Sequence, residues 1–304
     1  MSVKVTAPVA LFVYNRLDHL KLSIASLQEN PLAWASDLYL FSDGPKDDED
    51  IDRVLKVREF IQSISGFKEI YIFENEKNQG LANSIINGIS VVLQEHDKII
   101  VLEDDLLVSS DFLQYMNEAL DFYEDKNEVF SISAYCAPFK LNNFEQDTFF
   151  FSRINSWGWA SWRNRLDNVD WEVKDFNDFI KNKKLRKEFN LGGKDLTTML
   201  LKYKTGIIDS WAIRFNYACF KQKKLNLYPT NSKILNLGID NSGTNTKKTK
   251  KFDTYLKHNK VSFFNEVKED LIIRELYSNF LSPSIFRQLI NKYKILKYIK
   301  RMNK

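Results

Sequence analysis

The amino-acid sequence predicts an α/β fold: a mainly parallel central sheet, Rossmann-like in its alternation, flanked by helices. Short apolar runs alternate with amphipathic segments throughout the first 123 residues. Such close alternation is typical of right-handed βαβ units, which set successive strands parallel in one sheet. With 304 residues, of which 44% are hydrophobic, the chain is large enough for one α/β domain with an appendage.

The first half contains four predicted strands, at residues 7–14, 37–42, 69–73 and 98–102. Their apolar, largely β-branched or aromatic composition is typical of buried parallel strands. Residues 18–28 and 47–64, and a segment that becomes helical after 78–80, have helical spacing, and a fourth helix is expected at 111–123. A strong turn signal, Asp43-Gly44-Pro45, ends the second strand.

The second half of the chain has a different character. Residues 129–134, 148–151 and 225–228 are predicted strands, residues 177–203 and 211–221 are predicted helices, and residues 237–250 form a polar loop. Four of the six tryptophans lie within residues 153–171. We expect one domain at residues 1–246 and a helical, basic C-terminal extension at residues 247–304.

Charge and cysteine content exclude several classes of protein. The net charge of +4 is small and concentrated after Glu275, which does not indicate a nucleic-acid binder. The two cysteines, Cys136 and Cys219, have no CxxC spacing, and we see neither a signal peptide nor a long apolar span, so we expect buried thiols and a cytoplasmic location. Neither GxGxxG nor a P-loop occurs, which argues against nicotinamide enzymes and P-loop NTPases.

Three consecutive carboxylates, Glu103, Asp104 and Asp105, follow the fourth strand. Acids cannot continue a buried strand, so they must lie at its carboxyl end, the edge where open α/β sheets bind ligands. A divalent cation would relieve their repulsion, and hard oxygen ligands suit Mn²⁺ or Mg²⁺. Taken alone, however, a solvated acidic turn that caps the next helix is the simpler interpretation.

Polar residues after the other strands change this interpretation. Arg16 follows the first strand, Asp43 the second and Gly80 the third, so all converge with the acids at one edge of a parallel sheet. Asp43 could accept a hydrogen bond from a nucleotide base, and Arg16 could pair with Asp43 or contact the base. Gly80 would let backbone or phosphate come close. Together they favour a nucleotide site.

Seven segments, in order, resemble the GT-A family of nucleotide-sugar glycosyltransferases, and more narrowly bacterial sugar transferases related to N-acetylglucosaminyltransferase I. They are VYNR (13–16), FSDGP (41–45), NQGLA (78–82), VLEDDLLVSSDFL (101–113), SWGWASW (156–162), DSWAIR (209–214) and NLGIDNSGT (236–244). The acidic segment is the most specific, and the Trp-Gly-Trp block comes next.

The resemblance implies a role for each acid of the triplet. Asp105 would bind Mn²⁺ or Mg²⁺, which in turn holds the donor diphosphate. Asp104 would face the ribose or the donor sugar, and Glu103 the sugar hydroxyls.

The resemblance also implies the remainder of the donor site. Arg16 and Asp43 would recognise the base, which we expect to be uracil. Trp157 and Trp159 would wall the sugar pocket, with Gly158 allowing close approach, although ordinary aromatic packing also explains such a block.

An inverting transfer needs a base that deprotonates the acceptor hydroxyl. Asp209 is the candidate, because it follows apolar residues and partial burial could raise its pKa. Its alternative role is to cap the helix that starts at Trp211, and Asp240 is the second candidate for the base. Relatives often carry a His where this chain has Asn245, so that residue's role is not carried over.

These observations predict a metal-dependent hexosyl- or N-acetylhexosaminyltransferase that uses a nucleotide-sugar donor, most simply a UDP-sugar. The acceptor implied by the resemblance is a glycan or lipid-linked glycan in bacterial surface polysaccharide synthesis. Two alternatives remain: a nucleotidyltransferase acting on sugar phosphates, and a non-catalytic glycan-binding module on a degenerate transferase fold.

The C-terminal tail repeats apolar residues among lysines. Ile285, Leu289, Tyr293, Leu296 and Ile299 recur with helical spacing, and no acid follows Glu275. Such a helix suits the anionic inner face of a cell membrane, where the protein would be peripheral. Packing on the catalytic domain with the lysines in water is the alternative.

Overall fold

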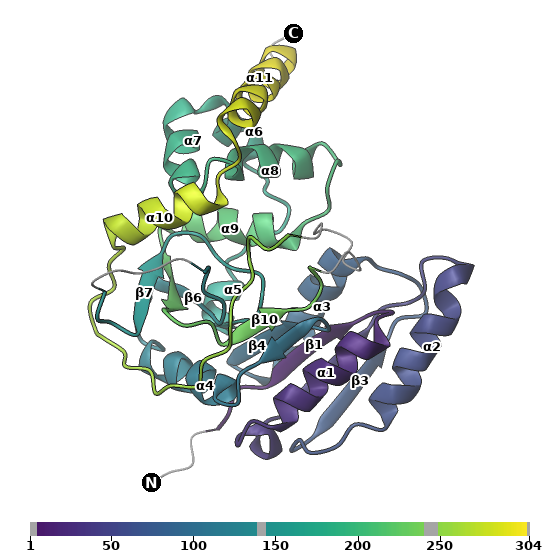
Figure 1. Ribbon diagram of the computed structural model, residues 1–304. Helices are drawn as coiled ribbons and strands as arrows, with labels where there is room; N and C mark the ends of the chain where they lie inside the picture. The colour runs from purple at the N-terminus through teal and green to yellow at the C-terminus, as the bar shows by residue number, and fades with distance from the viewer. Residues whose placement is uncertain (1–4, 139–143, 240–248, 303–304) are drawn as a thin grey trace.

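The computed structural model describes residues 5–138, 144–239 and 249–302 (Figure 1). Its large sheet has the strand order β3-β2-β1-β4-β8-β6-β9-β7, and a small second sheet pairs β10 with β5. The strands are β1 Val9–Val13, β2 Leu38–Ser42, β3 Ile70–Glu74, β4 Lys98–Glu103, β5 Leu106–Val108, β6 Val129–Ser133, β7 Thr148–Phe151, β8 Trp159–Trp162, β9 Leu225–Pro229 and β10 Ile234–Asn236. The helices are α1 Leu17–Gln28, α2 Asp48–Gln62, α3 Leu81–Glu95, α4 Phe112–Phe122, α5 Arg163–Leu166, α6 Phe176–Lys181, α7 Lys183–Phe189, α8 Leu196–Lys204, α9 Trp211–Lys221, α10 Leu271–Leu281 and α11 Ile285–Met302.

The predicted parallel half of the sheet is confirmed. β1 pairs in parallel with β2 and with β4, and β2 pairs in parallel with β3. Successive residues of a strand face opposite sides of the sheet: Val9, Leu11 and Val13 join the core cluster under α1, α2 and α4, whereas Ala10 and Phe12 join the cluster under α3 and α9. The strand ends that carry the predicted polar residues therefore share one edge.

The second half of the sheet is mixed. β8, which was not predicted, runs antiparallel to both β4 and β6 and joins the two halves. β9 is parallel to β6, and β7 is antiparallel to β9. The part of the Trp-rich block from Trp159 to Trp162 thus lies in the middle of the sheet. Cys136 and Cys219 are free and buried, as expected.

One predicted helix is divided. Residues 177–203 form the three helices α6, α7 and α8. The side chain of Asn182 accepts hydrogen bonds from the backbone N–H groups of Lys184 and Leu185 and so starts α7 anew. Gly193, with φ of 144°, follows a 3₁₀ turn and separates α7 from α8. These helices form a third core cluster with α9.

The C-terminal segment packs in two different ways. Ile273 and Tyr277 of α10 are buried in the core cluster of the sheet. By contrast, α11 extends away from the body of the molecule and packs against α6 and α8 (Figure 1). The predicted domain boundary after residue 246 falls outside the described residues.

Candidate functional site

The acidic triplet meets Arg16 at the carboxyl edge of the sheet. Arg16, which immediately precedes α1, donates a hydrogen bond from Nη2 to Oδ1 of Asp104 and another from Nη1 to Oδ2 of Asp105, the latter at 2.9 Å. The backbone N–H of Tyr14 also donates to Oδ2 of Asp104, at 3.2 Å. One guanidinium therefore holds two adjacent carboxylates, and the predicted pairing of Arg16 with Asp43 is replaced by this one.

Burial makes Glu103 and Asp104 difficult to ionise. Desolvation, together with the charges of Asp105 and Asp104, raises the pKa of Glu103 to about 8. Desolvation likewise raises the pKa of Asp104 to about 6, although Arg16 opposes that shift. Within the described part of the chain, the Glu103 side chain forms no hydrogen bond or ion pair. A crowded, desolvated acidic group of this kind is suited to receive a cation or sugar hydroxyls.

Asp43 orders the loop between β3 and α3. Its carboxylate accepts hydrogen bonds from the backbone N–H groups of Gly44, Gln79 and Gly80 at 2.9–3.1 Å, and from the Asn75 side chain at 3.3 Å. These donors fill the acceptor positions of a carboxylate. A direct bond from a base to Asp43 would thus have to replace one of them. Gly80, at φ of 76°, provides the left-handed turn before α3.

Gly238 and Asn236 complete the acidic edge, although sequence reasoning assigned neither a specific role. A Cβ on Gly238 would lie 2.1 Å from Oδ2 of Asp105 and 3.1 Å from Nη1 of Arg16. The backbone N–H of Leu237 donates to the Asp105 carbonyl at 2.8 Å. Asn236 precedes this contact on β10, and its buried Oδ1 accepts no hydrogen bond from any described residue. The sequence signal for Asn236 and Gly238 is that both lie in NLGIDNSGT (236–244), one of the segments that resemble the GT-A family.

The oxygen atoms at this edge fit a divalent cation. No described residue donates to Oδ1 of Asp105, and the orphaned Oδ1 of Asn236 lies on the strand paired with Leu106. Mg²⁺ and Mn²⁺ take few protein oxygens and complete their coordination with substrate phosphate and water. Among the described residues, however, no group of three or more His, Cys, Asp or Glu side chains is arranged around a common point.

The Trp-Gly-Trp block lies beside the acids, but its residues differ in role. Trp159 pairs with Val101 on the strand that ends at Glu103, so the block enters β8 near the end of β4 that carries the acids. Trp157 is half-buried and lines a cavity. Trp159 is fully buried against Trp211, so the prediction that it contacts a sugar is wrong.

Gly158 is required for packing within the fold. A Cβ at this position, where φ is 58°, would lie 2.3 Å from Cδ1 of Ile234 and 3.3 Å from the Cβ of Ala134. The predicted close approach is therefore made by core side chains and not by a sugar.

Asp209 lies close to this edge, at the start of α9. Its Oδ1 accepts a hydrogen bond from Nη2 of Arg214 at 2.9 Å, and its Oδ2 lies 4.0 Å from where a Cβ on Gly80 would stand. Ser210 caps the helix through a bond from the N–H of Ile213, so the capping alternative for Asp209 is wrong. Its side chain is 58% exposed, whereas partial burial was expected. Asp240 and Asn245 fall outside the described residues.

Comparison with family models identifies the class of protein. The model of glycosyl transferase family 2 matches residues 9–190, which is more than half of the chain. The chain therefore belongs to glycosyl transferase family 2 and has the GT-A fold of nucleotide-sugar glycosyltransferases. The matched range contains Arg16, Asp43 and the acidic triplet. No curated protein sequence matches the chain.

Solved structures show more distant similarity. A structure of TarS from S. aureus shares 14% identity at a TM-score of 0.31 over 47% of this chain and 24% of that chain. A structure of TarS 1-349 from S. aureus shares 10% identity at a TM-score of 0.40, over 75% of this chain and 59% of that chain. The mannosyltransferase PcManGT from Pyrobaculum calidifontis, in complex with GDP-Man and Mn²⁺, shares 12% identity at a TM-score of 0.40. The match covers 72% of this chain and 70% of that chain. The match spans less than two thirds of either TarS chain.

Proposed function

Given this family, we propose that the protein is a metal-dependent, inverting hexosyl- or N-acetylhexosaminyltransferase. It takes the sugar from a UDP-linked donor and passes it to a hydroxyl of a surface glycan or lipid-linked glycan on the cytoplasmic side of a bacterial membrane. The observation that carries this proposal is the pairing of Asp104 and Asp105 with Arg16 at the sheet edge, beside the loop that Asp43 organises.

The donor site follows from these contacts. Asp105 would hold Mn²⁺ or Mg²⁺ through Oδ1, with Asn236 as a second oxygen ligand. Asp104 and Glu103 face the ribose and the donor sugar. Arg16 and the Asp43 loop contact the base. A bound divalent cation stabilises the negative charge that develops on the departing diphosphate.

Transfer requires one proton to leave the acceptor. The carboxylate of Asp209 takes the proton from the acceptor hydroxyl, and the oxygen attacks the anomeric carbon from the face opposite the diphosphate. The bond between the anomeric carbon and the phosphate oxygen breaks, and its electron pair leaves with the nucleoside diphosphate. Arg214 holds the Asp209 side chain in place for this step.

The test is a nucleotide-sugar panel with Mn²⁺ and a crude lipid-glycan acceptor, in which nucleoside diphosphate release is measured. We expect Asp105→Ala and Asp209→Asn each to lower turnover by about 10²-fold or more. Asp175→Ala is the matched control, because Asp175 is also an ion-paired aspartate but pairs with Lys221. Absence of turnover beyond that of Asp105→Ala with every donor would refute an enzymatic function.

The exposed face of α11 supports peripheral attachment to an anionic membrane. Ile285, Phe286, Leu289, Tyr293 and Leu296 have exposed fractions of 52–78%. Basic side chains on the same helix would contact lipid headgroups. Ile299 instead packs with the α6–α8 cluster, so only part of the predicted apolar face is available. Among the described residues, no helix is long and apolar enough to cross a membrane.

Vesicle sedimentation tests this attachment. The full chain should sediment with phosphatidylglycerol vesicles and not with phosphatidylcholine vesicles. The double variant Phe286→Ser and Leu289→Ser should remain in solution, whereas Leu22→Ser, at another exposed leucine, should sediment normally. Equal sedimentation of both variants would disprove attachment through α11.

A further inference from the structure

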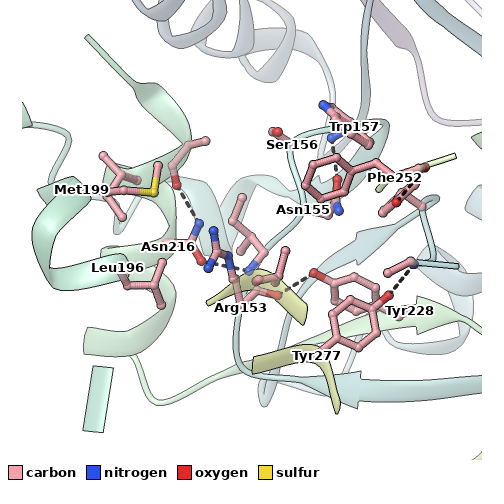
Figure 2. A pocket seen from close by; sticks show the side chains of 16 residues that line it. Arg153, Asn155, Ser156, Trp157, Leu196, Met199, Asn216, Tyr228, Phe252 and Tyr277 are labelled. Carbon is pink, nitrogen blue, oxygen red and sulfur yellow. Dashed lines mark hydrogen bonds between the residues drawn. The ribbon is translucent and has the colours of Figure 1, made fainter. Parts of the chain in front are cut away.

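A cavity of about 380 Å³ lies between the second half of the sheet and helices α8, α9 and α10 (Figure 2). Trp157 and Phe252 form one side of it, and Leu196 and Met199 of α8 form the other. Its volume is within the range of small-molecule sites in proteins. None of the donor-site roles described above uses this space, except that Trp157 borders both.

The cavity is lined by residues that are close in sequence to both sides of the proposed reaction centre. Trp157, on one wall, lies two residues before Trp159, which pairs with Val101 on the strand that ends at Glu103. Ala212 and Ile213, on another wall, belong to the first turn of α9, which begins two residues after Asp209. A molecule in the cavity would therefore contact the segment that leads into the acidic edge and the helix turn that follows the candidate base.

Aromatic rings dominate the lining. Trp157 packs edge-on against Tyr135 and Phe252, with ring centroids 4.8 and 5.6 Å apart. The hydroxyls of Tyr228 and Tyr277 already bond backbone groups, so these residues present rings to the space. Ligand sites that combine aromatic surface with a few polar groups suit rings that have apolar faces and polar edges.

Polar groups without partners lie at the same end as Trp157. Asn155 uses its Oδ1 to accept the N–H of Trp157 at 2.7 Å, but its Nδ2 bonds no described residue. The hydroxyl of Ser156 likewise has no partner within the described part of the chain. These groups can bond the hydroxyls of a ligand.

The cavity carries no uncompensated charge. Among the described lining residues, Arg153 alone bears a charge, and its Nη1 and Nη2 donate to the two carboxylate oxygens of Asp195 at 2.8 and 3.1 Å. A nucleoside diphosphate would find no counter-ion there, whereas a neutral pyranose needs none. The lining thus favours a sugar ring over a second nucleotide.

We propose that this cavity is the acceptor subsite and binds a neutral pyranose ring against Trp157, with its hydroxyls on Asn155 and Ser156. This inference rests on the proposed glycosyl transfer, because it places the acceptor hydroxyl toward Asp209. It names the acceptor class as a neutral hexose or N-acetylhexosamine unit.

Saturation-transfer NMR tests the proposal without requiring turnover. The full chain is mixed with the methyl glycosides of glucose, galactose, mannose, N-acetylglucosamine and N-acetylgalactosamine, and with octyl glucoside. We expect saturation of the ring protons of at least one glycoside. Met199→Trp, which fills the cavity, and Ser156→Val should each weaken that signal by about ten-fold. Leu22→Trp adds an indole on the exposed face of α1 and should change nothing.

Three results would overturn the proposal: no ring signal from any glycoside, saturation confined to the octyl chain, or an unchanged signal in both cavity variants. Thermal melting shows whether each variant is folded, and Ser156→Val remains decisive if Met199→Trp is not. Donor turnover is measured on the same samples. Turnover without glycoside binding would refute the acceptor subsite alone, and glycoside binding without turnover of any donor would refute the proposed function instead.

Discussion

The contact between Gly238 and Asp105 allows a sharp test of the donor site. Replacing Gly238 with alanine puts a Cβ 2.1 Å from Oδ2 of Asp105 and 3.0 Å from its Cγ. An ordinary contact needs more than 3 Å, so the carboxylate must move by about 1 Å, and its bond to Arg16 must lengthen. Displacements of about 1 Å in catalytic geometry cost about 10²-fold in rate.

The expected result for Gly238→Ala is therefore about 10²-fold less nucleoside diphosphate release and a higher Mn²⁺ concentration at half-maximal activity. The melting temperature should change little, because the clash involves one side chain at the edge. Gly206→Ala is the control: φ of 70° likewise strains an alanine at this position, but apart from its chain neighbours no described residue has an atom within 4 Å of the new Cβ. Wild-type activity and Mn²⁺ dependence in Gly238→Ala would refute the role of Asp105.

Three further variants test the electrostatics. Because the pKa of Glu103 is raised from 4.5 to about 8, the folded protein keeps a proton that the unfolded chain has lost, so the free energy of unfolding should fall between about pH 4.5 and 8. In urea titrations with EDTA, Glu103→Gln should flatten this fall and should be more stable than the wild-type protein by roughly 4–5 kcal/mol at about pH 8.5. An equal pH slope in the two proteins would contradict the shift. Asp43→Ala leaves the backbone N–H groups of its loop without an acceptor and should lower the free energy of unfolding by about 2–3 kcal/mol in the same titrations. A loss below about 0.5 kcal/mol would contradict this role of Asp43. Lys233→Met leaves Asp111 buried without its 2.6 Å partner and should cost about 3 kcal/mol, most of which Asp111→Leu in the same chain should restore.

The sequence predicts the parallel half of the fold well because local pattern determines it. β1 to β4 are apolar runs separated by helical segments, and each is followed by a polar residue at the shared edge. The order of strands in such units leaves few topologies. For this reason the strand pattern alone is enough to bring Arg16, Asp43, Gly80 and the acids to one edge.

The remainder depends on tertiary packing, which leaves little trace in local pattern. The local sequence around Gly158 and Trp159 would look the same whether these residues contacted a sugar or the core. Only the pairing of β8 with β4 shows that they pack in the core. The partner of Arg16 was also undetermined, because Asp43 and the acids are both near in space. The structure decides between them because backbone N–H groups already fill the Asp43 carboxylate.

If the proposed function is correct, the charges of the site should make donor binding dependent on a cation. Asp104 and Asp105 face one guanidinium, that of Arg16, and Glu103 lies beside them. A diphosphate approaching this edge is repelled unless a divalent cation first reverses the local charge, since opposite charges at such distances are worth several kcal/mol in a partly buried site. EDTA should thus abolish UDP binding itself, and not only turnover, in isothermal titration calorimetry. In Asp105→Asn the dependence on Mn²⁺ should weaken, because the repulsion falls with the charge. Tight UDP binding by the wild-type protein in EDTA would show that Arg16 alone offsets the acids, and the cation would then act only after the donor is bound.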